Sequence, residues 1–116
     1  MSTRRLCLAL DLKDDPALIE QYEAHHAPGR VWPEITQSIR DAGITDMEIY
    51  RSGNRLFMIM EVAETFDPVA KADADAANPK VQAWEQLMWQ FQQPLPWATN
   101  GEKWIDMKRI FKLDTL

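Results

Sequence analysis

The sequence predicts an α+β fold, in which helices cover one face of a four-stranded antiparallel sheet. This prediction rests on apolar runs too short for helices, on prolines that directly follow helix-capping residues, and on chain length. The chain has 116 residues, and domains cluster at about 100–150 residues. We therefore expect residues 1–116 to form one domain.

The N-terminal segment predicts a strand followed by a helix. Residues 4–12 form a short apolar run between charged residues, which is typical of a buried strand. Asp14 and Asp15 precede Pro16, and a capping acid before proline marks a helix start. That helix is expected to end near Ala27, before a Pro-Gly pair.

A second helix is predicted between Pro33 and Gly43. Ile35, Ile39 and Ala42 recur with the spacing of one helical face, and the glycine that follows is a typical C-terminal stop. Next along the chain, residues 46–51 and 55–63 are rich in Met, Ile, Tyr, Phe and Val. A Ser-Gly-Asn turn separates them, which predicts a β-hairpin.

Two more helices and a last strand are expected in the C-terminal half. Asp67-Pro68 starts an alanine-rich helix to about Ala77, and Asn78-Pro79 starts another that ends before Pro94. The fourth helix carries an apolar face of Val81, Trp84, Met88 and Phe91. Residues 104–111 alternate imperfectly and are interpreted as a strand at an edge or interface.

The resulting order, β-α-α-β-β-α-α-β, predicts a ferredoxin-like α+β sandwich with all helices on one face of the sheet. The other face needs a cover. Packing two such sheets against each other would supply it, so we expect a homodimer in the form of a dimeric α+β barrel. Five tryptophans in so short a chain also favour an aromatic pocket or interface.

Composition excludes several classes of partner. The formal net charge is −5 and the sequence contains no polybasic segment, so neither nucleic acid nor a membrane surface is an expected partner. No apolar run reaches the roughly 20 residues of a membrane span, and no signal peptide is recognised. Cys7 is the single cysteine, which excludes an internal disulfide and favours the cytoplasm.

Candidate catalytic residues lie at the end of the first helix. Tyr22 and His26 are four residues apart and share one helical face. Imidazole both gives and takes protons near neutral pH, although a histidine there is also explained by the helix dipole. His25 is expected at the surface. Adjacent histidines point about 100° apart, so no metal is predicted, and no cofactor motif is present.

Two tryptophans are candidates for the wall of a pocket. Trp84 lies on the apolar stripe of the fourth helix, so it is either a core residue or a ring that stacks on a sugar. Trp32 precedes Pro33 and carries the same two interpretations, with packing at the helix entry as the structural one.

These residues form a larger pattern that resembles the L-rhamnose mutarotase family over nearly the whole chain. The matching segments are Tyr22-x-x-x-His26, Pro28, Trp32-Pro33-Glu34, Gly43, Ile49-Tyr50, Asn54-Arg55-Leu56-Phe57, Met60-Glu61, Gln82-Ala83-Trp84 and Met88. The resemblance implies the dimeric ferredoxin-like fold and a cofactor-independent isomerase that interconverts sugar anomers. It also implies that His26 is the proton donor and that Tyr22 contacts the sugar.

The chain departs from the rhamnose-specific pattern at two substrate-facing positions. Met47 stands where those members carry a tyrosine, and Glu85 stands where they carry a second tryptophan. The chain looks more like the branch associated with L-fucose, so we expect a 6-deoxy hexose as the substrate, with L-fucose favoured over L-rhamnose.

The expected mechanism is general acid–base catalysis. His26 as imidazolium protonates the ring oxygen, Tyr22 orients a hydroxyl, and Trp84 packs on the ring. The partner base is left open among Asp11, Asp46 and Asp106. Two alternatives also stay open, because a fold does not determine a function: a dimeric α+β barrel monooxygenase-like or haem-binding protein, and a non-catalytic sugar-binding protein.

Overall fold

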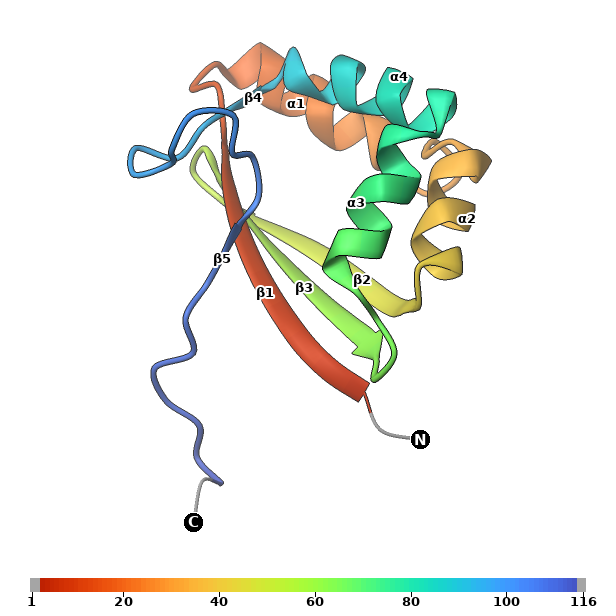
Figure 1. The fold of residues 1–116 in the computed structure, drawn as a ribbon. Helices are drawn as coiled ribbons and strands as arrows, with labels where there is room; N and C mark the ends of the chain where they lie inside the picture. Colours follow the sequence, from red (N-terminus) through yellow and green to blue (C-terminus); the bar gives the residue numbers. More distant parts are fainter. Residues whose placement is uncertain (1–2, 115–116) are drawn as a thin grey trace.

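A computed structural model describes residues 3–114, and its elements follow the predicted order (Figure 1). The sheet is antiparallel, with strand order β2-β3-β1-β4 and with β5 also paired to β1. The elements are β1 (Thr3–Leu12), α1 (Pro16–His25), α2 (Pro33–Asp41), β2 (Ile44–Ser52), β3 (Arg55–Ala63), α3 (Pro68–Ala76), α4 (Pro79–Trp89), β4 (Gln92–Gln93) and β5 (Ile105–Asp106).

Three of the four helices begin as their capping residues predict. The side chains of Asp15, Asp67 and Asn78 accept hydrogen bonds from backbone N–H groups of the first helical turn. Proline follows each of them, and its preset φ suits the first helical position. In α2, Trp32 occupies the capping position without a side-chain bond. The sequence signals therefore fix where these helices start.

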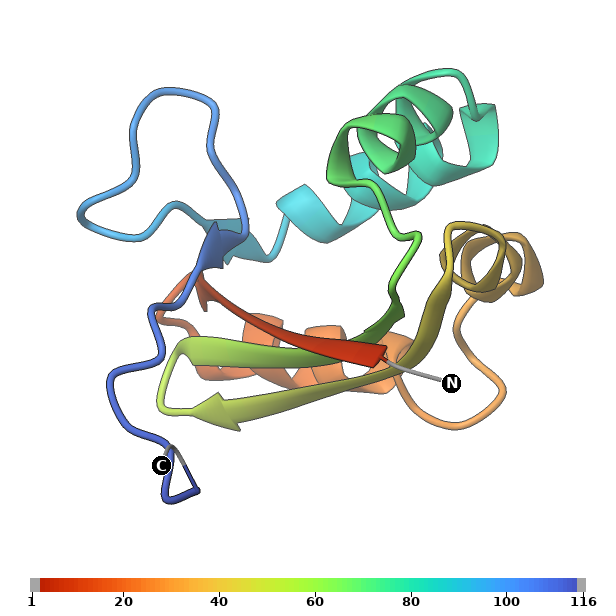
Figure 2. The same cartoon turned by 60° about the horizontal axis from the view of Figure 1, so that its bottom comes forward.

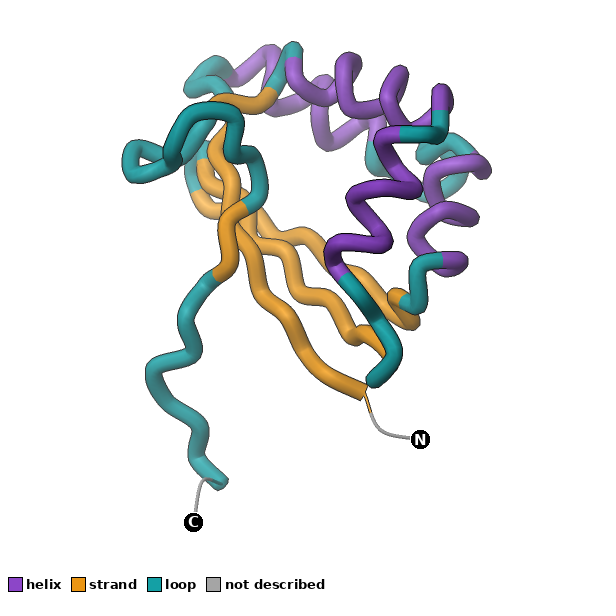
Figure 3. Tube along the Cα trace, viewed as in Figure 1, coloured by secondary structure: helices purple, strands orange, loops and turns teal. Residues whose placement is uncertain are grey.

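The helices all lie on one side of the curved sheet (Figure 3). Alternate residues of β1 and β3 face them, and this inner face is apolar and buried, as shown by Leu10, Leu56 and Val62. The intervening residues form the outer face, defined by the cross-strand pairs Arg5–Glu61, Cys7–Ile59, Ala9–Phe57 and Asp11–Arg55. The ferredoxin-like arrangement of the prediction is thus confirmed.

The predicted strand over residues 104–111 is wrong in its length. Only Ile105 and Asp106 pair with β1, and the Met107 N–H then donates to the Cys7 carbonyl at 2.8 Å. Residues 107–114, the C-terminal tail, leave the body of the molecule on the side away from α2 and α3 (Figures 1 and 2). A strand needs a partner ladder, and beyond Met107 the tail pairs with no other strand among residues 3–114.

The structure also contains a strand that the sequence did not predict. Gln92 and Gln93 form β4 directly after α4 and pair with Leu12 and Asp11 at the end of β1. Two polar residues give no strand signal by themselves. Within residues 3–114, no helix combines the length and the apolar character needed to span a membrane, and the cytoplasmic location stays a prediction.

Candidate active site

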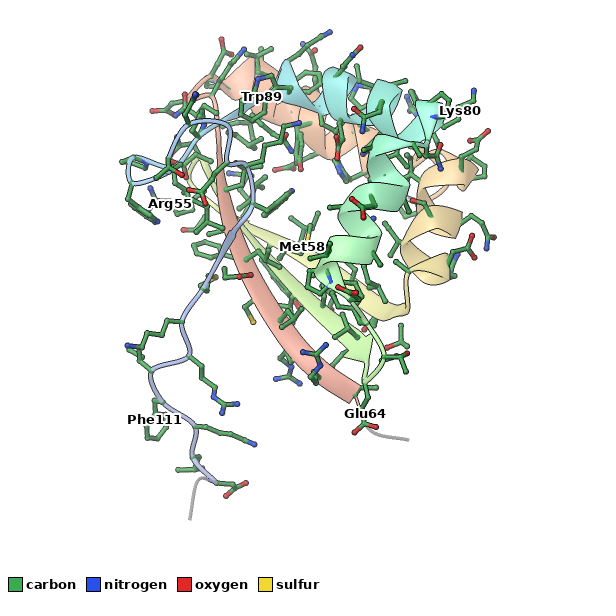
Figure 4. The ribbon with its side chains drawn as sticks, viewed as in Figure 1. Arg55, Met58, Glu64, Lys80, Trp89 and Phe111 are labelled. Carbon is green, nitrogen blue, oxygen red and sulfur yellow. The ribbon has the colours of Figure 1, made fainter. Side chains whose placement is uncertain are left out.

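A cavity of about 1030 Å³ lies between the inner face of the sheet and the helices. Its volume is at the upper end of the range for small-molecule sites. Met58 lies on the sheet side of this space (Figure 4). Other lining residues come from all three long strands and all four helices, among them Leu8, Met47, Tyr22, Ile39, Lys71 and Trp84. The chain therefore carries an open pocket with an apolar floor on the inner face of the sheet.

Tyr22 and His26 meet at the C-terminal end of α1, with their ring centroids 4.4 Å apart. Both line the cavity. His26 Nδ1 lies 2.8 Å from the Tyr22 carbonyl oxygen. A carbonyl oxygen only accepts hydrogen bonds, so Nδ1 must carry the hydrogen of the neutral ring. The other ring nitrogen, Nε2, is then the atom that can exchange a proton.

Burial controls the charge of His26. It lowers the pKa of the imidazole below its ordinary value of 6.5, and the neighbouring charge of His25 lowers it further, whereas the bond to the Tyr22 carbonyl opposes them. At neutral pH, the neutral ring therefore predominates. The predicted imidazolium is the minor form of the resting protein, and a neutral His26 is poised to accept a proton first.

Tyr22 is almost completely enclosed, with 4% of its surface exposed. Burial raises the pKa of its phenol to about 12, although a hydrogen bond from Gln92 lowers it. The Gln92 Nε2 donates to the phenol oxygen over 3.4 Å. Tyr22 is consequently a neutral hydroxyl at physiological pH, and its O–H is available as a hydrogen-bond donor.

Trp84 is both a core residue and part of the cavity wall, the two positions that the sequence left open. It belongs to the buried core and also lines the cavity. Its ring lies edge-on to that of His26, with centroids 5.6 Å apart. Trp32 also packs edge-on against the Trp84 indole, with ring centroids 5.2 Å apart, but does not line the cavity. Trp84 therefore lies at the cavity wall, whereas Trp32 packs against it without lining the cavity.

Met47 and Glu85 face the same cavity from different elements. Met47 pairs with Met60 in the hairpin and is half-buried. Glu85 follows Trp84 on α4, and its carboxylate is 3.5 Å from the Gln82 amide, which donates to it. Five of the six predicted site residues thus line one cavity, although they come from β2, from α4 and from α1 with its C-terminal capping residue.

The three aspartates left open as bases are placed differently. Asp11 lies on the outer face, where Arg55 donates two hydrogen bonds to its carboxylate, at 2.7 and 3.2 Å. That pairing removes Asp11 from the cavity. Asp46 and Asp106 are exposed and contribute to the cavity lining, so they retain access to it.

The sequence did not predict the positions of some residues at or beside the cavity. His25 is half-buried and packs against Phe91 at 5.5 Å, so its predicted surface position is wrong. Gln92 and Trp104 both line the cavity. Nothing in their local sequence marks them, because their approach to α1 depends on the path that the chain takes after α4.

Comparisons with known proteins show which family the chain belongs to. The family model described as L-rhamnose mutarotase matches residues 5–113. An L-fucose mutarotase of Xanthomonas campestris is 57% identical over 113 residues, 97% of this chain and 90% of that protein. An L-rhamnose mutarotase of Acidiphilium cryptum is 28% identical, covering 91% of this chain and 96% of that protein.

Solved structures confirm the fold. The crystal structure of L-rhamnose mutarotase FA22100 from Formosa agariphila superposes with a TM-score of 0.68 at 23% identity, over 96% of this chain and 99% of that one. A tetracenomycin F2 cyclase from Streptomyces glaucescens superposes at 0.61 with 14% identity, over 94% and 97%. Sequence and structure together confirm the predicted resemblance and the enzyme class: the chain belongs to the L-rhamnose mutarotase family.

Proposed function

We propose that this protein is an L-fucose mutarotase, which interconverts the α and β anomers of the sugar in the cavity between sheet and helices. One observation carries the proposal: His26, with Nδ1 occupied by a backbone carbonyl, leaves Nε2 free beside Tyr22 and Trp84 in a cavity. Ring opening of a sugar needs proton transfer, which an imidazole can supply, and a stacking surface holds the sugar in place for it.

His26 serves both proton transfers. Its neutral Nε2 accepts the proton of the anomeric hydroxyl, the released electron pair forms the C1=O bond, and the bond from C1 to the ring oxygen breaks. The resulting imidazolium then donates that proton to the ring oxygen, which gives the open aldehyde. Both oxygens are attached to C1, so one imidazole can reach them in turn. Closure on the other carbonyl face reverses each transfer.

The other side chains hold the sugar in place. The neutral Tyr22 hydroxyl donates to a sugar oxygen, and the Trp84 indole packs on the C–H side of the ring. Such positioning adds to the roughly 10²–10⁴-fold effect of acid–base catalysis. Trp32 supports the indole from the neighbouring helix entry.

The choice of L-fucose over L-rhamnose rests on two positions. Met47 offers an apolar surface, whereas Glu85 offers acceptors for a sugar hydroxyl, and both are half-buried at the cavity. The relative at 57% identity carries the name L-fucose mutarotase. A carboxylate that pairs with a hydroxyl discriminates against a sugar that points that hydroxyl elsewhere.

Saturation-transfer NMR tests this choice. Irradiating one anomeric proton should reduce the signal of the other anomer in L-fucose much more than in L-rhamnose. The double variant Met47→Tyr and Glu85→Trp should shift that ratio toward L-rhamnose by about tenfold, because one lost hydroxyl contact is worth about 1.4 kcal/mol. A ratio that stays unchanged in the variant would exclude these two positions as determinants.

We further infer that the protein acts as a homodimer built from the outer face and the C-terminal tail. In the tail, Ile110 is 89% exposed, Phe111 74% and Leu113 80%. Phe111 lies far from the sheet (Figure 4). Beyond Cys7, the edge of β1 next to β5 is unpaired within the described chain. An apolar extended segment and an open edge are complementary.

A second copy of the chain is the partner that fits this surface. Each copy carries both the open edge and the tail, so a two-fold arrangement satisfies both at once. The outer face adds the half-buried side chains of Phe57 and Ile59 and the exposed ring of Tyr50. Two sheets packed on these residues give the barrel expected from the element order.

A further inference from the structure

Gln92 is a polar residue in a buried position that the proposed reaction does not yet use. Together with Asp11, it is one of two buried polar or charged residues in the described chain, with 6% of its surface exposed. Asp11 has its ion pair with Arg55. Burying an amide is costly unless it is hydrogen-bonded, so the partner of Gln92 reveals what the amide does.

That partner is the phenol oxygen of Tyr22. The Gln92 Nε2 lies 3.4 Å from it, and the two residues are 70 positions apart in the chain. Both side chains also line the cavity. β4 holds Gln92 in this place, because its backbone pairs with Leu12 of β1. Two elements distant in the sequence thus fix one hydrogen bond at the wall of the site.

We propose that Gln92 is a positioning residue for Tyr22, and that its amide donates to the phenol oxygen so that the phenol O–H points at the sugar. A phenol has one hydrogen and two acceptor lone pairs. When one lone pair of the phenol oxygen accepts from the Gln92 Nε2, the phenol hydrogen points away from the amide. Tyr22 lines the cavity, and a sugar oxygen bound there would accept the hydrogen bond. This inference rests on the proposed function, since it assigns the role of Tyr22 in sugar binding.

The direction of this bond can be measured without any sugar. The chain has two tyrosines, so protein labelled with 3-fluorotyrosine and carrying Tyr50→Phe gives one fluorine resonance, that of Tyr22. Fluorine withdraws electrons and lowers the phenol pKa into an accessible range. If Gln92 donates to the phenolate, Gln92→Met should raise the midpoint of this titration. A midpoint that falls or does not move overturns the proposal.

Kinetics separate positioning from simple support of the fold. Gln92→Met, which keeps the volume but removes the donor, should lower kcat/KM for anomer exchange about tenfold, the worth of one hydrogen bond. In a Tyr22→Phe background, Gln92→Met should lower kcat/KM less than about twofold, because the hydroxyl that Gln92 orients is gone. Equal losses in both backgrounds would show that Gln92 does not act through Tyr22.

Two further variants complete the design. Gln93→Met places the same substitution on the neighbouring residue of β4 and should leave both the fluorine midpoint and kcat/KM unchanged. Gln92→Glu can only accept, so it should draw the phenol proton away from the sugar and reduce kcat/KM more than Gln92→Met does; a smaller loss contradicts the proposal. Absent anomer exchange in the unaltered protein would refute the proposed function, whereas the fluorine titration would still decide the Gln92 contact.

Discussion

The two faces of the sheet are built from alternate residues of the same strands, yet they differ in what covers them. On the inner face, Leu12 and Leu56 pack in one buried cluster with helical residues such as Trp84, which also lines the cavity. On the outer face, Ile59 stays half-buried between charged pairs. The helices of the same chain thus cover the inner face, whereas the outer face is the one for which we propose a second copy as the cover.

The largest effect is expected on the inner side. His26→Ala should lower the rate of anomer exchange by about 10²–10⁴-fold, because the acid–base group is lost. His25→Ala is the matched control and should cost far less activity, because His25 does not line the cavity, although it packs against Phe91 and lies edge-on to Trp84. Polarimetry of freshly dissolved α-L-fucose measures both. Full activity in His26→Ala would show that His26 is not the acid–base group of the reaction.

Stability should also separate the two faces. Leu56→Ala empties a position with 2% exposure and should cost about 2–5 kcal/mol of unfolding free energy. Ile59→Ala, on the outer face of the same strand, should cost less in dilute protein, where dimers dissociate. Urea titration of both variants measures these free energies. Equal losses would indicate that the outer face is already covered in the dissociated chain.

The outer side should control association. Phe111→Asp should raise the dimer dissociation constant about 30-fold, since a buried aromatic anchor at an interface is worth about 2 kcal/mol. Val69→Asp is the control, because Val69 is 68% exposed on α3, in the helical layer. Sedimentation velocity over a concentration series reports the constant. A monomeric unaltered protein at high concentration would contradict the proposed dimer.

The smallest effect concerns pH. Burial lowers the pKa of His26 below 6.5, so the neutral base persists below that pH, and kcat/KM should decline only with a midpoint under 6.5. Protonation also favours the unfolded chain, in which the pKa is ordinary. The contribution of His26 to stability is therefore complete above 6.5 and is lost as pH falls through the folded-state pKa. A midpoint above 6.5 in the activity profile would refute this assignment.

The sequence predicts the inner face better than the outer one, for physical reasons. Capping residues and apolar periodicity are local signals, and they located the helix starts at Pro16, Pro68 and Pro79. The spacing of Tyr22 and His26 likewise predicted a contact within one helix, which the structure confirms. Local rules suffice wherever a residue and its neighbours belong to the same element.

Contacts between distant segments could not be predicted in this way. The bond from Gln92 to Tyr22 depends on β4, a strand of two residues without a β pattern. The strand predicted over residues 104–111 pairs only at Ile105 and Asp106. An alternating pattern forms a strand only where a neighbouring strand pairs with it. For the residues after Asp106, the partner that we propose belongs to a second copy of the chain.

The most direct test of the proposed mutarotase activity is the rate at which the two anomers of L-fucose exchange at equilibrium. Saturation of one anomeric proton should be transferred to the other in proportion to the concentration of added protein, and replacing His26 by Ala should return the transfer to its value in buffer. Transfer that is equal with and without the unaltered protein would contradict the proposed activity.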